Sequence, residues 1–390
     1  MQLQEFQAKK LLSQYAIACP PGAVAVTPDE AEAAAARLDA NTIFVKAQIH
    51  AGERSAAGGV RAVQSARDAK AAAGELLGLK LTTSQTGPHG QTVKSVLVEA
   101  GIHAERELYL AIQIDSLSGS IMLTAGRGGG VDIERRFAAR TLELESLLLG
   151  MKGERHPGDI VELSRRIGLA EGSAKKFREL VVKLHRAFVE FDAGLIEINP
   201  LVLTAAGDLV AVDAKLVIDD NALYRHPDLK ELREDEHTDR VELQAQRHQI
   251  NFVQMDGDIG TVVNGAGLAL ATLDMIGAAG GSPANFMDIR TTAKSLDIAQ
   301  GIGLVLENPR AKVLLVNVFG GGMQPCDTIA EALGIAFHRG PRILPVVLRI
   351  TGNNEDLALL RLANFKLPKT ECSDMWQAVT RAVAIAQGRA

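Results

Sequence analysis

Three almost uninterrupted apolar runs in the last third of the chain constrain its fold most strongly. They occupy residues 261–263, 311–319 and 343–349. Strands that are covered on both faces are apolar at nearly every position, whereas strands with one wet face alternate. Each run ends in a turn rich in glycine or asparagine, and ligands of open parallel sheets bind at such carboxyl ends. We therefore expect an α/β domain of the flavodoxin-like, doubly wound type over residues 236–390.

The first part of the chain, residues 1–235, has a different pattern. Leu3, Phe6 and Leu11 follow helical spacing, and Pro28 can begin an alanine-rich helix that extends to Leu38. Strand-like runs follow at residues 42–45, 95–98, 108–112 and 120–123. Many strands with interspersed helices predict α+β or mixed α/β layers. Residues 226–248 are dense in charge, which indicates a solvated connection between domains that is partly helical.

An acidic patch within residues 194–213 is the first candidate site. Its apolar residues favour a strand, Pro200 is expected to end that strand, and a turn at 205–208 precedes a second strand. Such a hairpin can bring Glu197 or Asn199 near Asp213 and create a cluster of hard oxygen ligands. Nucleotide-bound Mg²⁺ prefers such oxygens. From the spacing alone, a magnesium site and a hairpin with solvated acids remain open.

The charge balance excludes several classes of function. The 390 residues carry a formal net charge of −5, so we expect no nucleic-acid partner. No apolar run approaches the roughly 20 residues of a membrane span, so we expect no membrane partner either. The N-terminus does not resemble a signal peptide. The three cysteines are isolated, which favours a reduced, cytoplasmic setting.

Seven segments, in order along nearly the whole chain, carry a resemblance to a known family. They are residues 3–9, 45–52, 197–201, 220–225, 263–269, 283–288 and 315–321. With these segments the sequence resembles the β subunits of succinyl-CoA synthetase (succinate–CoA ligase), a family that includes malate–CoA ligase β subunits. The resemblance implies an ATP-grasp module over residues 1–235, followed by a CoA-ligase domain over residues 236–390.

The resemblance also implies an activity and a partner. A separate α subunit would bind CoA and carry a histidine that is phosphorylated during turnover. The reaction would be reversible: a small carboxylate, CoA and ATP or GTP give an acyl-CoA, the nucleoside diphosphate and phosphate, with Mg²⁺ required. Succinate is the default acid. Neither the choice between ATP and GTP nor that between a heterodimer and a heterotetramer follows from the sequence.

Matching positions imply roles in nucleotide binding. Lys46 would bind nucleotide phosphate as a point charge. Glu99 would lie at the adenine and ribose edge, with the backbone of Ile102 nearby, and Glu107 would accept hydrogen bonds from the ribose side.

The resemblance assigns the metal and acyl-substrate sites as well. Asn199 and Asp213 match Mg²⁺ ligands, and Glu197 matches an acid beside the phosphohistidine. Asn264 matches a residue next to the carboxylate substrate. The turn of Gly321, Gly322 and Met323 opens a helix whose N-terminus could hold a phosphoryl group.

One departure from the family lies in the phosphate loop that follows His50. Glu53 and Ser55 stand where the family has glycines, and Ala56 replaces a lysine, while Arg54 remains as a phosphate contact. A side chain restricts such a turn. A carboxylate about 4 Å from a phosphate charge costs about 4 kcal/mol at an effective dielectric constant near 20. Nucleotide binding at Glu53–Ser55 is therefore expected to be weaker or differently arranged.

Three further departures fall on other ligand loops. Arg290, Thr291 and Thr292 replace three glycines, residues 319–327 form a longer turn without its arginine, and Arg127 stands where the family has a threonine–glutamate pair. Two interpretations remain open. In one, the chain is a working ligase with an altered pocket, in which Arg290 and Thr292 supply donors for malate, another di-acid or a sulfonated acid. In the other, it is a non-catalytic nucleotide-binding paralogue.

Overall fold

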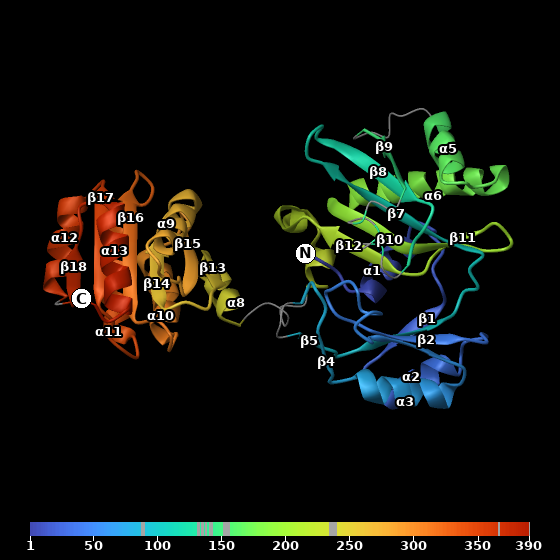
Figure 1. Ribbon diagram of the computed structural model, residues 1–390, viewed down its shortest axis with the longest axis horizontal. Coiled ribbons are helices and arrows are strands. Elements are labelled where there is room, and N and C mark those ends of the chain that lie inside the picture. Colours follow the sequence, from blue (N-terminus) through green and yellow to red (C-terminus); the bar gives the residue numbers. More distant parts are fainter. Residues whose placement is uncertain are drawn as a thin grey trace. The chain divides into compact units, whose positions relative to one another are not determined.

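A computed structural model of the chain describes most residues in two compact units. The described residues are 1–86, 90–130, 133, 136, 139, 143–150, 157–233, 240–365 and 367–389. The units comprise residues 1–234 and 235–390 and are treated separately (Figure 1). The boundary expected between residues 235 and 236 lies outside the described residues.

The first layer of the N-terminal unit is a four-stranded sheet covered by two helices. Its strands lie in the order β1 (Gly22–Ala25), β6 (Val96–Ala100), β2 (Ile43–Ala47) and β3 (Val60–Val63). Helices α2 (Pro28–Ala35) and α3 (Ala66–Leu76) pack on it through small apolar side chains (Figure 1). The hydroxyl of Thr27 caps α2 by accepting from Glu30 N at 3.2 Å. The helix ends at Ala35, three residues before the expected Leu38.

The second layer is a six-stranded antiparallel sheet that contains the acidic patch. Its strands are β7 (Arg106–Asp115), β8 (Ser120–Gly126), β9 (Leu144–Leu148), β10 (Ala193–Leu203), β11 (Leu209–Ala211) and β12 (Ala214–Ile218). Helix α1 (Glu5–Ser13), α5 (Pro157–Arg166) and α6 (Glu171–Glu190) share its apolar core with the turns η1 (Asp220–Arg225) and α7 (Pro227–Lys230). A two-stranded ribbon, β4 (Lys80–Leu81) and β5 (Gln91–Thr92), completes the unit.

The expectation that Pro200 ends its strand is wrong. β10 continues through Pro200 to Leu203, and its register with β7 shifts between Ile198 and Leu201. Proline cannot donate to the ladder, so an interior strand accommodates it at an irregularity of this kind. On the other edge the register is constant from Leu195 to Leu203, where Leu201 pairs with Ala211 and Ile198 with Ala214; the shift on that edge lies before Leu195.

The C-terminal unit has the predicted flavodoxin-like architecture. Its sheet runs in the order β13 (Ile250–Gln254), β15 (Asn285–Ile289), β14 (Ile259–Val263), β16 (Val313–Gly320), β17 (Val346–Gly352) and β18 (Lys369–Glu371). Only β13 pairs antiparallel, at the edge. Without β13 the order is 2-1-3-4-5, as in flavodoxin-like folds. Every residue of β14 is buried, as the apolar run predicted.

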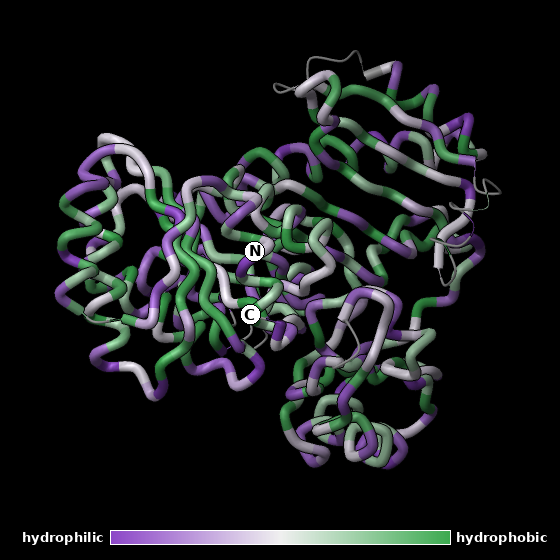
Figure 2. Tube along the Cα trace, turned by 60° about the vertical axis from the view of Figure 1, so that its left-hand side comes forward, coloured by the Kyte–Doolittle hydropathy of each residue, from purple (hydrophilic) through white to green (hydrophobic). Residues whose placement is uncertain are grey.

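Helices cover both faces of this sheet. One core contains residues of α8 (Arg240–Arg247), α10 (Ser295–Glu307), α11 (Cys326–Arg339) and α12 (Glu355–Asn364). A second core, on the opposite face, contains α9 (Ala266–Ala278) and α13 (Met375–Ala386). The central strands are coloured hydrophobic along most of their length in Figure 2. Strands β14, β16 and β17 are parallel neighbours, so their carboxyl ends lie at one edge of the sheet. The turns predicted from the sequence project from that edge.

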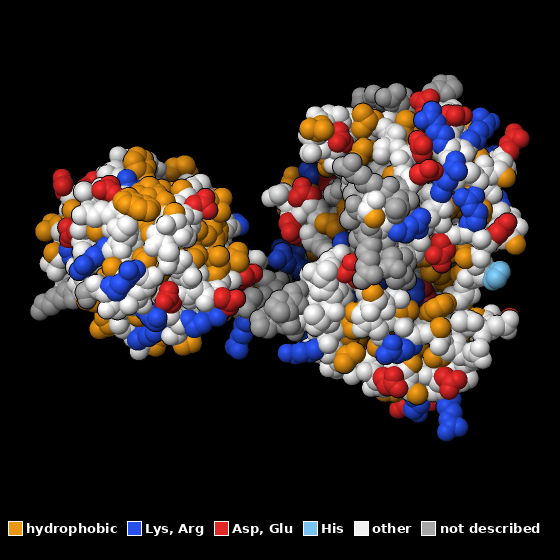
Figure 3. Space-filling view, viewed as in Figure 1, with side chains coloured by type: hydrophobic (Ala, Val, Ile, Leu, Met, Phe, Trp, Pro, Cys, Tyr) orange, Lys and Arg blue, Asp and Glu red, His pale blue; other side chains and the backbone are white. Residues whose placement is uncertain are grey.

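Charged side chains of both signs lie on the surface (Figure 3). On the face shown in Figure 3, acidic and basic side chains are intermingled over both units. Within the described ranges, no helix is long and apolar enough to cross a membrane.

Candidate nucleotide site and carboxyl-edge site

A cavity of about 370 Å³ in the N-terminal unit gathers most of the residues predicted to bind nucleotide and metal. Its lining includes Lys46, Glu53, Arg54, Ser55, Glu107, Glu197, Asn199 and Asp213. These side chains come from β2 and the loop after it, from β7, from β10 and from the connection between β11 and β12. Glu99 and Ile102 are not among the lining residues: Glu99 is 1% exposed within β6, and Ile102 lies in the loop after it.

The predicted proximity of Asn199 and Asp213 is confirmed. The backbone N–H of Asn199 donates to Asp213 O at 3.2 Å, which makes the two residues direct neighbours across the strands. Side chains two residues apart share a face of a strand. Glu197, paired with Lys215, therefore lies on the same face as Asn199 and Asp213. One carboxylate and one amide oxygen suit Mg²⁺, which takes its remaining ligands from phosphates and water.

A glycine turn after β8 holds the Asn199 amide. Gly130 N donates to Asn199 Oδ1 at 2.6 Å, and Asn199 Nδ2 donates back to Gly130 O at 3.4 Å. Glycine is required here for two reasons. Gly130 has φ +87°, and a Cβ at Gly129 would lie 2.3 Å from Leu108 O. Arg127 of the same segment turns away and donates to Arg166 O at the end of α5, at 2.6 Å and 2.8 Å.

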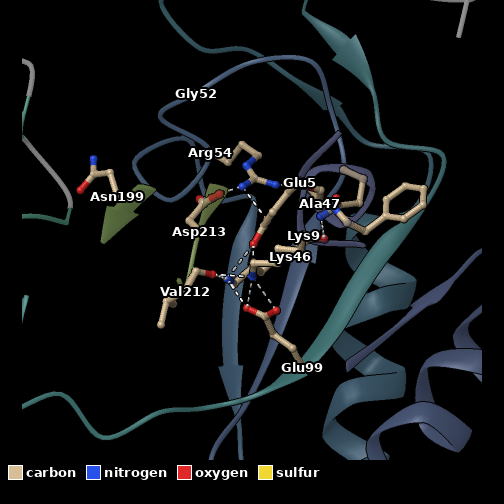
Figure 4. A network of polar contacts seen from close by, with 12 residues as sticks. Glu5, Lys9, Lys46, Ala47, Gly52, Arg54, Glu99, Asn199, Val212 and Asp213 are labelled. Carbon is tan, nitrogen blue, oxygen red and sulfur yellow. Dashed lines mark hydrogen bonds and ion pairs between the residues drawn. The ribbon is translucent and has the colours of Figure 1, made fainter. Parts of the chain in front are cut away.

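Lys46 lies in a buried cluster of opposite charges (Figure 4). Its ammonium is 3.0 Å from Glu5 Oε1 and 2.9 Å from Val212 O, and it also pairs with Glu99. Lys9 contacts the same three groups, at 2.7 Å from Glu5 and 2.7 Å from Glu99. These four charged side chains are each at most 7% exposed. The cluster joins α1 to β2, β6 and the break between β11 and β12.

Arg54 extends this cluster to the face that carries the predicted metal ligands. Its guanidinium lies 2.6 Å from Glu5 Oε2, donates to Asp213 Oδ2 at 2.8 Å and donates to Ala47 O at 3.0 Å. Three cations, Lys9, Lys46 and Arg54, thus face three carboxylates, those of Glu5, Glu99 and Asp213. This balance meets the requirement that buried charges be paired.

Electrostatics keeps Glu5 ionised and keeps Lys46 and Arg54 charged. Burial alone would raise the pKa of Glu5, but Lys46, Lys9 and Arg54 outweigh it and hold that pKa well below the usual value. Burial also opposes the charge of Lys46, yet Glu5 and Glu99 raise its pKa. For Arg54 likewise, Asp213 and Glu5 outweigh burial and raise the pKa.

The phosphate loop shows the effect of its unusual side chains. Glu53 has φ +57°, the left-handed conformation that glycine adopts without strain. The loop is closed by Gly59 N donating to Arg54 O at 2.7 Å, and Ser84 N donates to Glu53 Oε2 at 3.4 Å. Ser55 and Ala56 are exposed. The Glu53 side chain is half-buried and remains in the cavity lining.

The predicted substrate residues of the C-terminal unit lie at the carboxyl edge of its sheet. Asn264 follows β14 and exchanges hydrogen bonds with the backbone of Phe319 in β16, at 2.8 Å and 2.9 Å. Gly321 and Gly322 follow β16, and Met323 is 70% exposed. The hydrogen bonds between the Asn264 side chain and the Phe319 backbone connect the turn after β14 to the end of β16.

Two of the altered loops at this edge are joined to each other. Gln324, 4% exposed, reaches the backbone oxygens of Arg290 and Thr291, each at 3.2 Å, once its amide is oriented to donate. The Arg290 guanidinium donates to Asn251 Oδ1 at 3.1 Å and 3.3 Å. The Thr292 hydroxyl donates to Gln249 Oε1 at 2.8 Å, so its proton is engaged within the protein and not offered to a substrate.

The sequence did not single out Glu5 and Lys9 as site residues. They lie within the matched segment 3–9 and are four apart on α1, a spacing at which opposite charges pair. That spacing is the one local signal; their contacts with Lys46, Glu99 and Arg54 span 41 residues or more in the sequence.

The fold and the cavity define an ATP-grasp module joined to a CoA-ligase domain. The family model for the ATP-grasp domain matches residues 2–203, and that for CoA-ligase matches residues 262–382. Succinate–CoA ligase [ADP-forming] subunit β of Ralstonia pickettii is 39% identical over the full length of both chains. The same subunit of Anaeromyxobacter dehalogenans is 41% identical over 99% of this chain and all of its own. This chain belongs to the family of succinate–CoA ligase β subunits.

A solved structure supports the fold at lower identity. ATP citrate lyase from Methanothrix soehngenii, determined with citrate and coenzyme A, superposes with a TM-score of 0.74. It is 18% identical, and the match covers all of both chains.

Proposed function

We propose that this chain is the β subunit of an ADP-forming carboxylate–CoA ligase with succinate as its default acid. The chain would bind ATP or GTP, and a separate α subunit would bind most of the CoA and carry the phosphorylated histidine. The complex would act in the cytoplasm. The observation that carries the proposal is the cavity in which Lys46, Arg54, Asn199 and Asp213 converge.

The cavity residues have distinct proposed roles. Lys46 and Arg54 would bind the nucleotide phosphates, with Glu53 and Ser55 as neighbours in the loop, and Glu107 would face the ribose. Asn199 and Asp213 would hold Mg²⁺, which neutralises phosphate charge when bound. Glu197 would hold the incoming phosphohistidine. Glu99 and Ile102 stay predicted contacts of the adenine and ribose, although Glu99 is engaged by Lys9 and Lys46 in this structure.

The carboxyl edge of the second unit would complete the reaction. Asn264 would orient the small carboxylate, and the turn of Gly321, Gly322 and Met323 would hold the phosphoryl group at the start of α11. The dipole of α11 favours an anion at its N-terminus.

The test is phosphoryl transfer to the partner. The chain is purified with its α subunit, mixed with Mg-ATP, and the α histidine is examined for phosphate by mass spectrometry. We expect stoichiometric phosphorylation. No phosphorylation, with both subunits folded and associated, would contradict the ligase and leave the non-catalytic nucleotide-binding paralogue.

One observation favours that second candidate. The groups expected to bind phosphate and metal are engaged with protein: Lys46 with Glu5 and Glu99, Asp213 with Arg54, and the Asn199 oxygen with Gly130. A paralogue that binds nucleotide weakly would keep this arrangement. ADP binding without histidine phosphorylation would support it.

A further inference from the structure

Glu5 stands between two of the cations that line the cavity, Lys46 and Arg54. One carboxylate oxygen lies 3.0 Å from Lys46 Nζ, and the other lies 2.6 Å from Arg54 Nη2. The side chain is 2% exposed, yet Glu5 is among the residues that line the cavity (Figure 4). A phosphate group that bridged Lys46 and Arg54 would need the same position.

The number of N–H donors on Lys46 also indicates that a phosphate would have to displace Glu5. An ammonium has three N–H donors. Here its partners are Glu5, Glu99 and the carbonyl of Val212. A phosphate can therefore reach Lys46 only if one of the three withdraws. Glu99 is not in the cavity wall, and the Val212 carbonyl is fixed by the strand pairing around it, so Glu5 is the partner that can exchange.

We propose that Glu5 is a resident counter-anion that competes with nucleotide phosphate for Lys46 and Arg54. The proposal rests on the nucleotide site proposed above and adds an exchange: an incoming polyphosphate takes the positions of the Glu5 oxygens, and the Glu5 carboxylate retains Lys9 as its partner. Lys9 is suited to this because it lies four residues along the same helix, 2.7 Å from Glu5. Glu5 thereby lowers the affinity of the site for phosphate and, together with Glu99 and Asp213, balances the charges of Lys9, Lys46 and Arg54.

The proposal predicts an increase in affinity on removing an acid. The full-length chain and its Glu5→Gln variant are titrated calorimetrically with tripolyphosphate, and separately with ADP, both in the presence of EDTA. Because one charge-assisted hydrogen bond contributes roughly 1.5–3 kcal/mol, we expect Glu5→Gln to bind tripolyphosphate about tenfold more tightly or better. A residue that only positions Lys46 would give equal or weaker binding, which would overturn the proposal.

Two variants control for folding and for net charge. Glu5→Gln combined with Lys9→Gln restores the charge balance of the cluster, and circular dichroism verifies the fold of each variant; this pair should still bind tripolyphosphate more tightly than the native chain. Glu190→Gln removes an exposed acid of the same unit that pairs with Arg186 at 2.7 Å. It should change affinity by less than about twofold.

The two ligands separate this proposal from the proposed function. Tripolyphosphate needs only the cations, whereas ADP also needs the base and ribose contacts. Tighter tripolyphosphate binding without any ADP binding would support the exchange and contradict the nucleotide assignment. ADP binding with unchanged tripolyphosphate affinity in Glu5→Gln would support the nucleotide site and overturn the exchange.

Discussion

Arg54 donates to Asp213 Oδ2 at 2.8 Å, so the side chain expected to bind phosphate holds the carboxylate expected to bind metal. The two residues are 159 positions apart. Arg54 lies in the connection between β2 and β3 and Asp213 in that between β11 and β12, and these strand pairs belong to different sheets of the N-terminal unit. Charges in one network do not act independently. Arg54 Nη2 also lies 2.6 Å from Glu5, so a phosphate that replaces Glu5 there would share this nitrogen with Asp213, and this connects the two binding events.

Replacing Arg54 by methionine should therefore separate metal binding from nucleotide binding. Asp213 loses its cation, so Mn²⁺ alone should bind the variant at least about threefold more tightly, while Mn-ADP binds more weakly. Electron paramagnetic resonance of free Mn²⁺ measures both. Lys176→Met, which removes a surface partner of Asp208, is the control, and tighter Mn²⁺ binding in that variant as well would contradict the coupling.

Restoring glycine at position 53 should improve the phosphate loop. The left-handed φ of +57° costs Glu53 conformational free energy that glycine would not lose, and removing the carboxylate also removes its repulsion from the nucleotide. We expect Glu53→Gly to be stabilised by up to about 1 kcal/mol and to bind Mg-ADP more tightly. Ala16→Gly relieves a similar φ of +52° after α1, and thermal unfolding and calorimetry should show its stability gain without a change in affinity.

The glycine turn at Gly130 should not tolerate alanine. An added Cβ would lie 2.3 Å from Glu107 Oε2, so the end of the Glu107 side chain would have to shift from its position in the cavity wall, and the residue has φ +87°. Gly119 has φ +64° in the turn between β7 and β8 but nothing within 4 Å, so it is a matched control. Gly119→Ala should cost about 1 kcal/mol of unfolding free energy. Gly130→Ala should cost more and also slow histidine phosphorylation; equal effects in the two variants would refute a role for this turn.

The buried cluster should make the N-terminal unit sensitive to acid. Because the pKa of Glu5 is held below its value in the unfolded chain, the unfolded state binds more protons, and stability falls as the pH drops below about 4.3. The Glu5 contribution is fully present above that pH and is lost as the pH falls through the lowered pKa. Urea unfolding at several pH values should show a shallower decline below pH 4.3 for Glu5→Gln. An identical slope in both proteins would contradict this.

Arg290 should decide which acid is accepted. The Thr292 hydroxyl is committed to Gln249, so Arg290 is the remaining donor of the pair predicted from the sequence. With the α subunit and CoA, Arg290→Gly should lower kcat/KM about tenfold for acids with an additional hydroxyl or anionic group, relative to succinate. Arg310→Gln, which breaks a surface pair with Asp256, should leave the ratio unchanged. An unaltered ratio in Arg290→Gly would remove the residue from substrate selection.

The sequence predicted the C-terminal sheet well because its signal is local. Continuous apolar strands that end in glycine turns require burial on both faces, and β14, β16 and β17 follow those runs. The hairpin around Asn199 and Asp213 could be predicted for the same reason, since the alternation of side chains along a strand fixes which of them share a face.

What the sequence did not predict depends on contacts between distant segments. Glu5 reads as an ordinary polar residue of an amphipathic helix until the fold places it beside Lys46 and Arg54. The hydrogen bond from Gly130 N to Asn199 Oδ1 likewise joins residues 69 positions apart. Pro200 misled because proline is ordinarily a strand terminator, and the register shift that admits it comes from the pairing of β10 with β7.

From Leu195 to Leu203, β10 pairs with β12 and β11 in one constant register, and this restricts which length changes the hairpin can tolerate. The pairs Leu201–Ala211 and Ile198–Ala214 have the same register on both sides of the connection between β11 and β12, so Asn199 lies opposite Asp213. Deleting or inserting one residue between Leu209 and Val212 would turn Asp213 toward the apolar core and withdraw the carbonyl that Lys9 and Lys46 share. Natural length variation in this family should therefore collect in the turn at 204–208 and spare the short segment that follows it.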